Sequence, residues 1–540
     1  MRHIKYLLPI LVLLCCGWWA AYSRNEIWYD LHNYHFYNGW AFLNGKTFSN
    51  YFVSGAYTFF APLLDSLTYL QIKTFNNYPQ LIFFMNGAFH GVIILIAWAI
   101  LRLFIPVKNK TDLWMMVALL LYAITGYAYT QQIGSTTHEI TCAIIFLTAF
   151  YLFVKKVFFE KKASEWLLFG ISGLVGGVLG LKLTIFPMCV GFGALVLFCA
   201  AIGQFKRPIK ALLIISIGFL IGFGLTDGWW LYLVWQKTGN PIFPMANHIF
   251  KSSLIPAESV RDIRFLPQTI GQWLFYPLYW GTDSGYMTEP ELKEKIYHAI
   301  IPFICAIALT GMCLVGKIKE RREQAVVLLY DVSYVVWLVL FSILRYAIVL
   351  EVLSGLMIFL MIKRFKMTER IKRILAGMLV VVSVLFPFGY SSFRTVSNET
   401  YMPMTTITVA DDTIVAVAEN LNSYVVPYIK TSNPVLGWPL ATLTAPLPWD
   451  KQTKQTYYDL LRDKKVLIIS SIAKVKQMFE KNPDLFPRQE INLKPGNPEN
   501  WVGDTIIVAG QIKDGIWRGI DVAPGQTDRF ILEMADQEKR

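Results

Sequence analysis

The 540-residue chain has little charge for its size and no cysteine outside its apolar segments. Asp, Glu, Lys and Arg make up 16% of the residues, well below the roughly 25% of an average soluble protein. The stretch beyond residue 390 contains no cysteine at all. A disulfide framework and a CxxC zinc site are therefore excluded. All seven cysteines lie in apolar runs: Cys15, Cys16, Cys142, Cys189, Cys199, Cys305 and Cys313.

Apolar residues dominate the composition. Hydrophobic residues make up 55% of the chain, and the mean hydropathy is +0.43. Such a chain needs lipid as its solvent. The 37 Phe, 27 Tyr and 17 Trp suit a bundle with aromatic rings at both membrane interfaces.

The basic residues that produce the net charge of +13 fall between apolar runs. Placing them all on the cytoplasmic side satisfies the positive-inside rule, so the charge does not indicate a nucleic-acid partner. The clusters are Arg2/Lys5, Lys108/Lys110, Lys155/Lys156/Lys161/Lys162, Lys206/Arg207/Lys210, Lys317/Lys319/Arg321/Arg322 and the run from Lys363 to Arg373.

Apolar runs of spanning length predict about eleven transmembrane helices, with the N-terminus inside. The first run can also be a signal peptide, and either alternative places the next residues outside. The predicted ranges are 6–22, 80–105, 113–130, 139–156, 166–182, 184–203, 211–226, 298–316, 325–343, 346–362 and 374–390.

Three long segments are expected outside the membrane. The loop 23–79 contains two amphipathic stretches, 32–43 and 59–75, and a second loop covers 227–297. Residues 391–540 alternate between strand-like and helix-like patterns, as in KKVLIISS, IAKVKQMFEKN and DTIIVAG. We therefore expect a polytopic α-helical membrane protein, with a membrane module over 1–390 and an extracytoplasmic α/β domain over 391–540.

Two acids at the expected outer surface are candidate catalytic residues. Asp30 follows the first span, and Glu139 begins the fourth in QQIGSTTHEITC. Together they could share a divalent cation or a proton. Taken alone, Asp30 is better explained as a solvated loop residue, and Glu139 as an acid at a helix N-terminus capped by one of the three residues 135–137.

Further charges lie in or beside apolar runs. Lys182 stands between the fifth and sixth spans, Arg345 opens the tenth, and Glu351 lies inside it. Because a charge at the centre of a membrane helix costs about 2.5 to 3.5 kcal/mol, such residues indicate function. Lys182 and Arg345 can hold an anionic headgroup, or they can extend to the interface. His90 and Asp331 are interpreted as structural polar groups.

The second outer loop contains an aromatic-rich segment, TDGWWLYLVWQKTGNPIFPMANHIFK (226–251). It suits either a contact surface for a sugar or isoprenoid, or an ordinary interfacial aromatic belt.

Six motifs occur in one order between residues 29 and 355: YDLHNYHFYNGWAFLNGK, YTFFAPLLD, IGSTTHEIT, GLKLT, GNPIFPMAN and RYAIVLEVLSG. Together they resemble the GT-C superfamily of bacterial membrane glycosyltransferases, especially the glycosyltransferase 87-like enzymes. The C-terminal domain is not covered by the resemblance.

The resemblance implies a GT-C-like fold and transfer of a sugar from a polyprenyl-phosphate donor to a glycan, lipid or protein acceptor. It implies that Asp30 is the catalytic base and Glu139 its partner, with Mg²⁺ or Mn²⁺ as an optional cofactor held by both. The family's partner acid is often Asp and its first loop often carries paired acids, whereas here Glu139 and a lone Asp30 after Glu26 also allow a metal-free mechanism. Substrate contacts are expected from Lys182, Arg345, Tyr346, His138 and Tyr34. The implied location is a bacterial inner membrane, with membrane lipids around it.

Two other functions remain open. A transporter or lipid flippase would also keep charges in the membrane, but it predicts broken helices that meet at the midplane. A polymerase or ligase of surface polysaccharide would depend on arginines in an outer loop, and Arg261 and Arg264 are candidates.

Overall fold

The computed structural model describes most of the chain. It covers residues 4–24, 26–27, 29–255, 257, 262–279, 296–385, 394–395, 400–402, 406–417, 420–437, 459–460, 465–471, 505–513 and 516–520. The chain divides into two compact units. The first contains residues 1–24, 83–229 and 263–391, and the second contains 25–82, 230–262 and 392–540.

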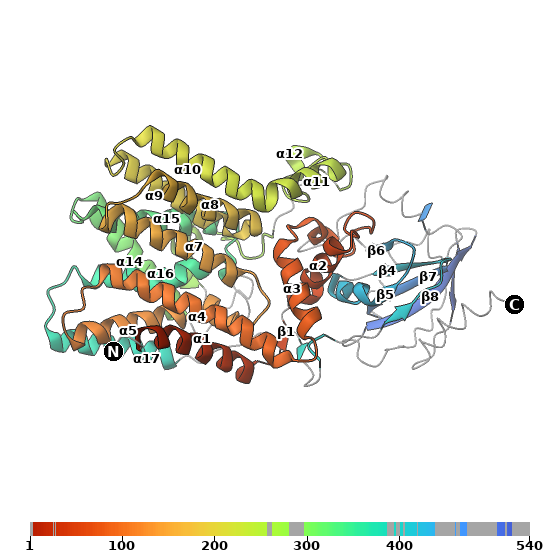
Figure 1. The fold of residues 1–540 in the computed structure, drawn as a ribbon, viewed down its shortest axis with the longest axis horizontal. Helices are drawn as coiled ribbons and strands as arrows, with labels where there is room; N and C mark the ends of the chain where they lie inside the picture. Colours follow the sequence, from red (N-terminus) through yellow and green to blue (C-terminus); the bar gives the residue numbers. More distant parts are fainter. Residues whose placement is uncertain are drawn as a thin grey trace. The chain divides into compact units, whose positions relative to one another are not determined.

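The first unit is a helical bundle, and a helix lies in each of the eleven ranges expected to cross a membrane (Figure 1). Proline at the first turn and side-chain caps such as Asn109 and Ser164 define several helix starts. The helices are α1 (Ile4–Ser23), α4 (Pro79–Phe104), α5 (Lys110–Ile124), α7 (Glu139–Val154), α8 (Glu165–Leu181), α9 (Phe186–Ala201), α10 (Pro208–Phe223), α14 (Ile296–Leu314), α15 (Arg321–Leu340), α16 (Ile348–Ile362) and α17 (Glu369–Leu385).

Six helical segments of the described residues are long and apolar enough to cross a membrane. Three shorter apolar helices, Leu7–Ser23, Glu165–Leu181 and His298–Leu314, lie among them. The chain is thus a helical protein with the apolar helices of a membrane protein. The six segments are Pro79–Phe104, Glu139–Phe159, Leu183–Ala201, Pro208–Thr238, Arg321–Leu340 and Leu344–Ile362.

Short helical elements connect or extend the long helices. The π-helical turns η3 (Lys155–Phe159) and η5 (Gly224–Gly228) directly extend α7 and α10. The other short elements are α6 (Tyr127–Gln131), η4 (Leu183–Ile185), α11 (Trp229–Thr238), α13 (Ile270–Phe275), η6 (Tyr276–Tyr279) and η8 (Leu344–Ala347).

Helices α8 and α10 pack closely along each other (Figure 1). A Cβ atom added at Gly176 would overlap the carbonyl oxygen of Phe219, and one at Gly222 would overlap that of Gly173. The two backbones therefore approach where both helices carry glycine, as small residues allow in membrane helix pairs.

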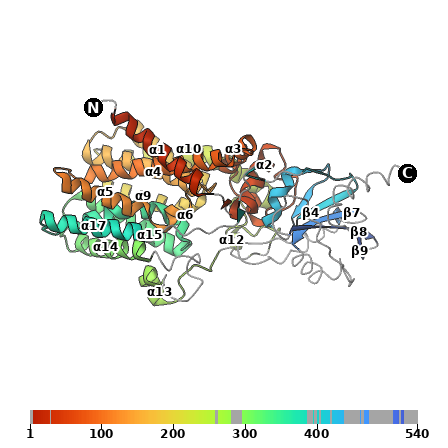
Figure 2. The same cartoon turned by 90° about the horizontal axis from the view of Figure 1, so that it is seen from below.

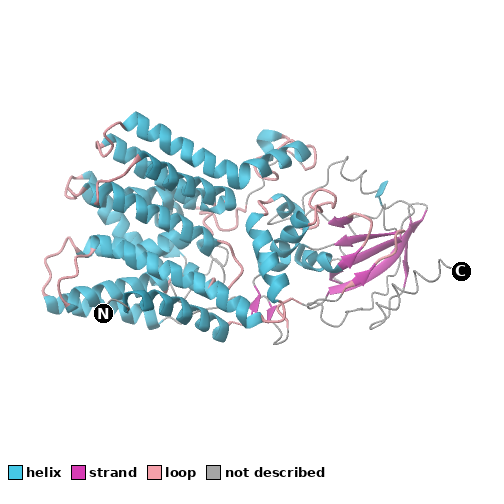
Figure 3. Cartoon of the chain, in the orientation of Figure 1, coloured by secondary structure: helices cyan, strands magenta, loops and turns pink. Residues whose placement is uncertain are grey.

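The second unit combines short helices with all of the described strands (Figure 3). The expected amphipathic stretches are helical, although the first begins with a π-helical turn. The helices are η1 (Leu31–His35), α2 (Phe36–Leu43), η2 (Gly55–Phe59), α3 (Leu63–Phe75), α12 (Asn247–Phe250) and η9 (Asn420–Tyr428).

The main sheet of this unit has five strands in the order β6-β4-β7-β8-β9. Figure 2 labels four of them, β4, β7, β8 and β9. Strands β6, β4 and β7 are parallel, whereas β7, β8 and β9 are antiparallel. All of β4 is buried, as expected for a strand between two parallel neighbours. The strands are β4 (Thr413–Val417), β6 (Val435–Gly437), β7 (Lys465–Ser471), β8 (Thr505–Lys513) and β9 (Ile516–Ile520).

The expected strands in KKVLIISS and DTIIVAG correspond to β7 and β8. The expected helix in IAKVKQMFEKN lies outside the described residues. Two further strand pairs are short: β1 (Glu26–Ile27) with β2 (Arg394–Thr395), and β3 (Ile407–Thr408) with β5 (Ile429–Lys430).

The structure groups the first long loop and residues 230–262 of the second with the C-terminal residues, whereas the sequence pattern grouped both loops with the membrane module. Hydrogen bonds between these segments explain this grouping. The Tyr51 amide donates to the Val435 carbonyl at 2.9 Å, and the Gly437 amide donates to the Tyr51 carbonyl at 2.6 Å. The Trp230 indole N–H donates to the Phe59 carbonyl at 2.9 Å, which attaches the second loop to the first.

Candidate functional site

A buried ion pair lies at one end of the helical bundle. Glu139 is in the first turn of α7, and Lys182 directly follows α8. The Lys182 Nζ atom lies 2.6 Å from Oε1 of Glu139, and the two side chains are 13% and 4% exposed. The start of α7 also favours an acid through the helix dipole. The charge of Glu139 is therefore stabilised from two directions.

Arg345 and Tyr346 lie in the turn η8, just before α16, and join this pair. Arg345 interacts electrostatically with both Glu139 and Lys182, and Tyr346 does so with Lys182. Arg345 Nη2 donates to the Tyr346 hydroxyl at 3.3 Å. The structure therefore brings together four of the expected site residues, with one acidic and two basic side chains among them.

The second carboxylate oxygen of Glu139 is the less satisfied of the two. Oε2 is buried and accepts no hydrogen bond from another described residue. A buried carboxylate oxygen without a partner is costly. A substrate hydroxyl, a proton or a cation could satisfy it.

Residues just before α7 make hydrogen bonds next to the cluster of Glu139, Lys182 and Arg345. Gln132 Nε2 donates to the Arg345 carbonyl at 3.3 Å, and Gln132 Oε1 accepts from the Thr137 hydroxyl at 2.8 Å. The cap expected from residues 135–137 is replaced by His138, which is the N-cap residue and makes no side-chain capping hydrogen bond. His138 is 7% exposed.

Glu351 has a structural role in the described contacts. Its two carboxylate oxygens accept from the amides of Ala128 and Tyr129, at 2.9 and 2.7 Å. Both amides lie in the first turn of α6, where backbone N–H groups need an acceptor. Glu351 thus holds the N-terminus of α6 against α16.

Two other polar groups of the apolar helices also form local contacts. His90 Nε2 lies 2.9 Å from the Gln132 carbonyl. The Thr310 hydroxyl donates to the carboxylate of Asp331. Both contacts support their interpretation as structural residues.

Asp227 is a buried acid that the sequence analysis did not single out. It lies in the π-helical turn η5, is 1% exposed, and its Oδ1 atom accepts no hydrogen bond from the described residues. A Cβ atom added at Gly180 would lie 2.9 Å from the Cβ of Asp227, so the acid is next to the end of α8. The sequence pattern that could have indicated Asp227 is an aspartate directly after a long apolar run, expected on the same side of the membrane as Lys182.

Asp30 belongs to the second unit, immediately before η1. It is 7% exposed, and its side chain does not cap the helix that follows. Because Glu139 belongs to the first unit, a cation shared by the two acids stays a prediction.

Tyr34, an expected substrate contact, lies in an aromatic group of the second unit. Its ring stacks on Tyr57 with centroids 4.7 Å apart, and Phe60 packs edge-on against it at 5.9 Å. The side chain is 6% exposed. In these contacts Tyr34 is a packing residue.

His35 and Asp65 form a second buried pair that the sequence pattern did not indicate. His35 Nδ1 lies 2.6 Å from Asp65 Oδ1, and both side chains are 3% exposed. This contact joins η1 to α3, directly beside the turn that begins after Asp30. Only the packing of the two helices reveals it, because thirty residues separate the pair.

One of the two arginines that a polymerase or ligase would use lies among the described residues. Arg261 lies outside the described residues. Arg264 lies over the ring of its neighbour Phe265, 5.3 Å from the ring centroid.

No protein-family model matches the chain, and neither a curated protein nor a solved structure matches it. The function must therefore be inferred from the chemistry of its own residues.

Proposed function

We propose that the protein is a GT-C-like membrane glycosyltransferase that transfers a sugar from a polyprenyl-phosphate donor to a glycan, lipid or protein acceptor. The cluster of Glu139, Lys182 and Arg345 carries this proposal. Its two cations and one anion give a formal charge of +1 at the end of apolar helices. A phosphate attached to a long apolar chain has the complementary chemistry.

The donor phosphate would be bound by Lys182 and Arg345. A guanidinium group can hold two phosphate oxygens at once, while an ammonium group acts as a point charge. As the bond between the sugar and the phosphate breaks, negative charge grows on the phosphate. Cations placed in advance stabilise that charge most strongly in the transition state.

Asp30 would act as the general base. The acceptor hydroxyl oxygen attacks the anomeric carbon and forms the new glycosidic bond, while the Asp30 carboxylate takes the hydroxyl proton. The bond from the anomeric carbon to the phosphate oxygen breaks, and its electron pair leaves with polyprenyl phosphate. In-line attack inverts the anomeric centre.

The proposed setting is a bacterial cytoplasmic membrane crossed eleven times, with the N-terminus inside. Six helices of spanning length, three shorter apolar helices and the basic clusters between them support this topology. The acids Asp30 and Glu139 and the C-terminal residues would then all be on the outer side.

The proposed reaction allows a metal-free mechanism, because Lys182 already balances the charge of Glu139. If the enzyme uses Mg²⁺ or Mn²⁺, the Oε2 atom of Glu139 would supply one of its oxygen ligands. Sensitivity to a chelator distinguishes the two cases.

The decisive experiment measures release of polyprenyl phosphate from a panel of polyprenyl-phosphate hexoses and pentoses by the protein in liposomes. An envelope extract supplies acceptors, and each reaction runs with and without EDTA. We expect wild type to consume at least one donor and Asp30→Asn to lose this activity. A folded wild-type protein that consumes no donor would instead favour a transporter.

A further inference from the structure

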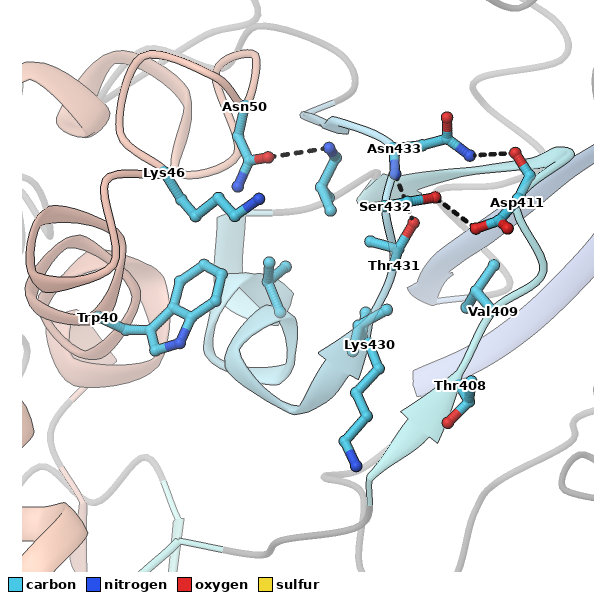
Figure 4. Close-up of a pocket in the computed structure, with 13 residues that line it drawn as sticks. Trp40, Lys46, Asn50, Thr408, Val409, Asp411, Lys430, Thr431, Ser432 and Asn433 are labelled. Atoms are coloured by element: carbon cyan, nitrogen blue, oxygen red, sulfur yellow. Dashed lines mark hydrogen bonds between the residues drawn. The ribbon is translucent and has the colours of Figure 1, made fainter.

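A pocket of about 470 Å³ opens within the second unit (Figure 4). Its volume falls in the range of roughly 300 to 1,000 Å³ typical of small-molecule sites. Trp40, Lys46 and Asn50 lie on one side, and residues 430–433 lie on the other. The first long loop and the C-terminal residues therefore build the pocket together.

Hydrogen bonds hold these two walls in place. The Val435 amide donates to Asn50 Oδ1 at 3.0 Å, and Asn50 Nδ2 donates to the Tyr37 hydroxyl at 3.0 Å. Tyr51 forms an isolated parallel bridge with Leu436 next to this contact. Because the backbone fixes both walls, the pocket does not have to be ordered when a ligand binds.

The lining of the pocket combines an aromatic face with hydroxyl and amide groups. Trp40 is half-buried and contributes an indole ring, while Val426 and Ile429 contribute apolar surface. Thr408 and Thr431 place hydroxyl groups around them. A ring with an apolar face and a polar edge fits this arrangement, because the aromatic side chain covers the face and the polar groups meet the edge.

The charge of the pocket is positive. Lys46 and Lys430 line it, and neither forms an ion pair with a described residue. Asp411, the acid of the pocket, already accepts hydrogen bonds. The Ser432 hydroxyl donates to its Oδ1 at 2.5 Å, and the side-chain amide of Asn433 donates to its backbone carbonyl at 2.6 Å. The two lysines are thus available to an anionic ligand.

We propose that this pocket binds an acidic saccharide, meaning a sugar unit that carries a carboxylate, sulfate or phosphate group. Trp40 packs against the face of the sugar ring, and Lys46 and Lys430 bind the anionic substituent. This binding does not depend on the proposed transfer reaction. Only its use as a holding site for the acceptor glycan depends on that function.

The test uses the full-length protein in lipid nanodiscs and measures dissociation constants for matched oligosaccharides. The panel contains oligosaccharides bearing uronic acid, sulfate or phosphate groups, each beside its neutral counterpart. We expect at least one acidic member to bind, and about tenfold weaker binding by Trp40→Ala and by the Lys46→Gln/Lys430→Gln double variant. The double variant should bind the neutral counterpart as wild type does.

Lys73→Gln is the matched control, because Lys73 is an exposed lysine of the same unit that does not line the pocket. Its affinities should equal those of wild type. No binding by any acidic oligosaccharide, or equal affinity for acidic and neutral members, overturns the proposal. Binding of inorganic phosphate or uridine monophosphate as tightly as the best saccharide overturns it as well. Donor consumption is assayed separately, so failure here leaves the transferase proposal standing.

Discussion

Lys182 and Glu139 form an ion pair with an Nζ to Oε1 distance of 2.6 Å, although they are 43 positions apart in sequence. The pair joins the end of α8 to the start of α7. Each charge alone would be costly among apolar helices, and each reduces the cost of the other. Arg345 then adds the charge that makes the cluster a suitable anion site.

Removal of one partner of this pair should be more damaging than removal of both. Lys182→Met removes the cation that directly contacts the buried Glu139 carboxylate, and breaking a buried pair in this way typically costs about 3 to 5 kcal/mol. Lys182→Met/Glu139→Gln removes both charges and should recover most of that loss. Unfolding midpoints in one detergent measure the free energies of this double-mutant cycle. If the two single effects simply add, the pair is not coupled as described.

Loss of the proposed base should abolish transfer and leave the fold intact. We expect Asp30→Asn to lower the rate constant of donor consumption by about 10² to 10⁴, the usual contribution of a general base. Its unfolding midpoint should match that of wild type. Glu26→Gln changes another acid of the same loop and should keep full activity. Equal loss in both variants would contradict a specific role for Asp30.

The helices were predictable from the sequence, but their pairings were not. The length of an apolar run is enough to predict a helix, so the expected range 139–156 overlaps α7 closely. The sequence analysis grouped Glu139 with Asp30 and Lys182 with Arg345, because membrane side was its only guide. Packing of α7 against α8 instead pairs Glu139 with Lys182.

Contacts between side chains and the backbone also could not be predicted from the sequence pattern. A glutamate in an apolar helix indicates a polar partner, but nothing in the sequence identifies the amides of Ala128 and Tyr129 as the partners of Glu351. Similarly, the contact between Tyr51 and Val435 depends on strand register across almost 400 residues. Such long-range pairing is what places the first loop beside the C-terminal sheet.

The bidentate geometry of the Arg345 guanidinium group should contribute to donor binding beyond its positive charge. Arg345→Lys keeps the positive charge but loses bidentate binding, so we expect KM for the polyprenyl-phosphate donor to rise about tenfold. Steady-state kinetics over a range of donor concentrations measures this change. Arg264→Lys is the control. If Arg264→Lys impairs transfer while Arg345→Lys does not, a polymerase or ligase with loop arginines becomes the better description.

The attachment of the N-terminus of α6 to α16 should depend on the charge of Glu351. Glu351→Gln weakens two hydrogen bonds to a carboxylate, and a typical bond to a charged group contributes about 1.5 to 3 kcal/mol. We expect a lower unfolding midpoint and faster hydrogen exchange in residues 126–131. Glu165→Gln, an exposed acid paired with Lys210 in the same unit, should change stability by less than about 1 kcal/mol. Unchanged exchange in residues 126–131 would show that other contacts hold α6.

The approach of α8 to α10 should tolerate no side chain at Gly176. An added Cβ would overlap the carbonyl oxygen of Phe219, and that backbone atom cannot move without shifting α10. Overpacking of this kind costs about 1 to 3 kcal/mol. We therefore expect Gly176→Ala to lower the unfolding midpoint and, because Lys182 follows the same helix, to reduce donor consumption too.

Gly170→Ala separates this packing effect from helix propensity. Gly170 lies in the same helix, but no heavy atom lies within 4 Å of an added Cβ there. Alanine favours helix over glycine by about 1 kcal/mol, so Gly170→Ala should be neutral or stabilising. Opposite signs for the two variants would identify the backbone approach as the cause. Equal effects at both positions would mean that α8 and α10 do not rely on close contact at Gly176.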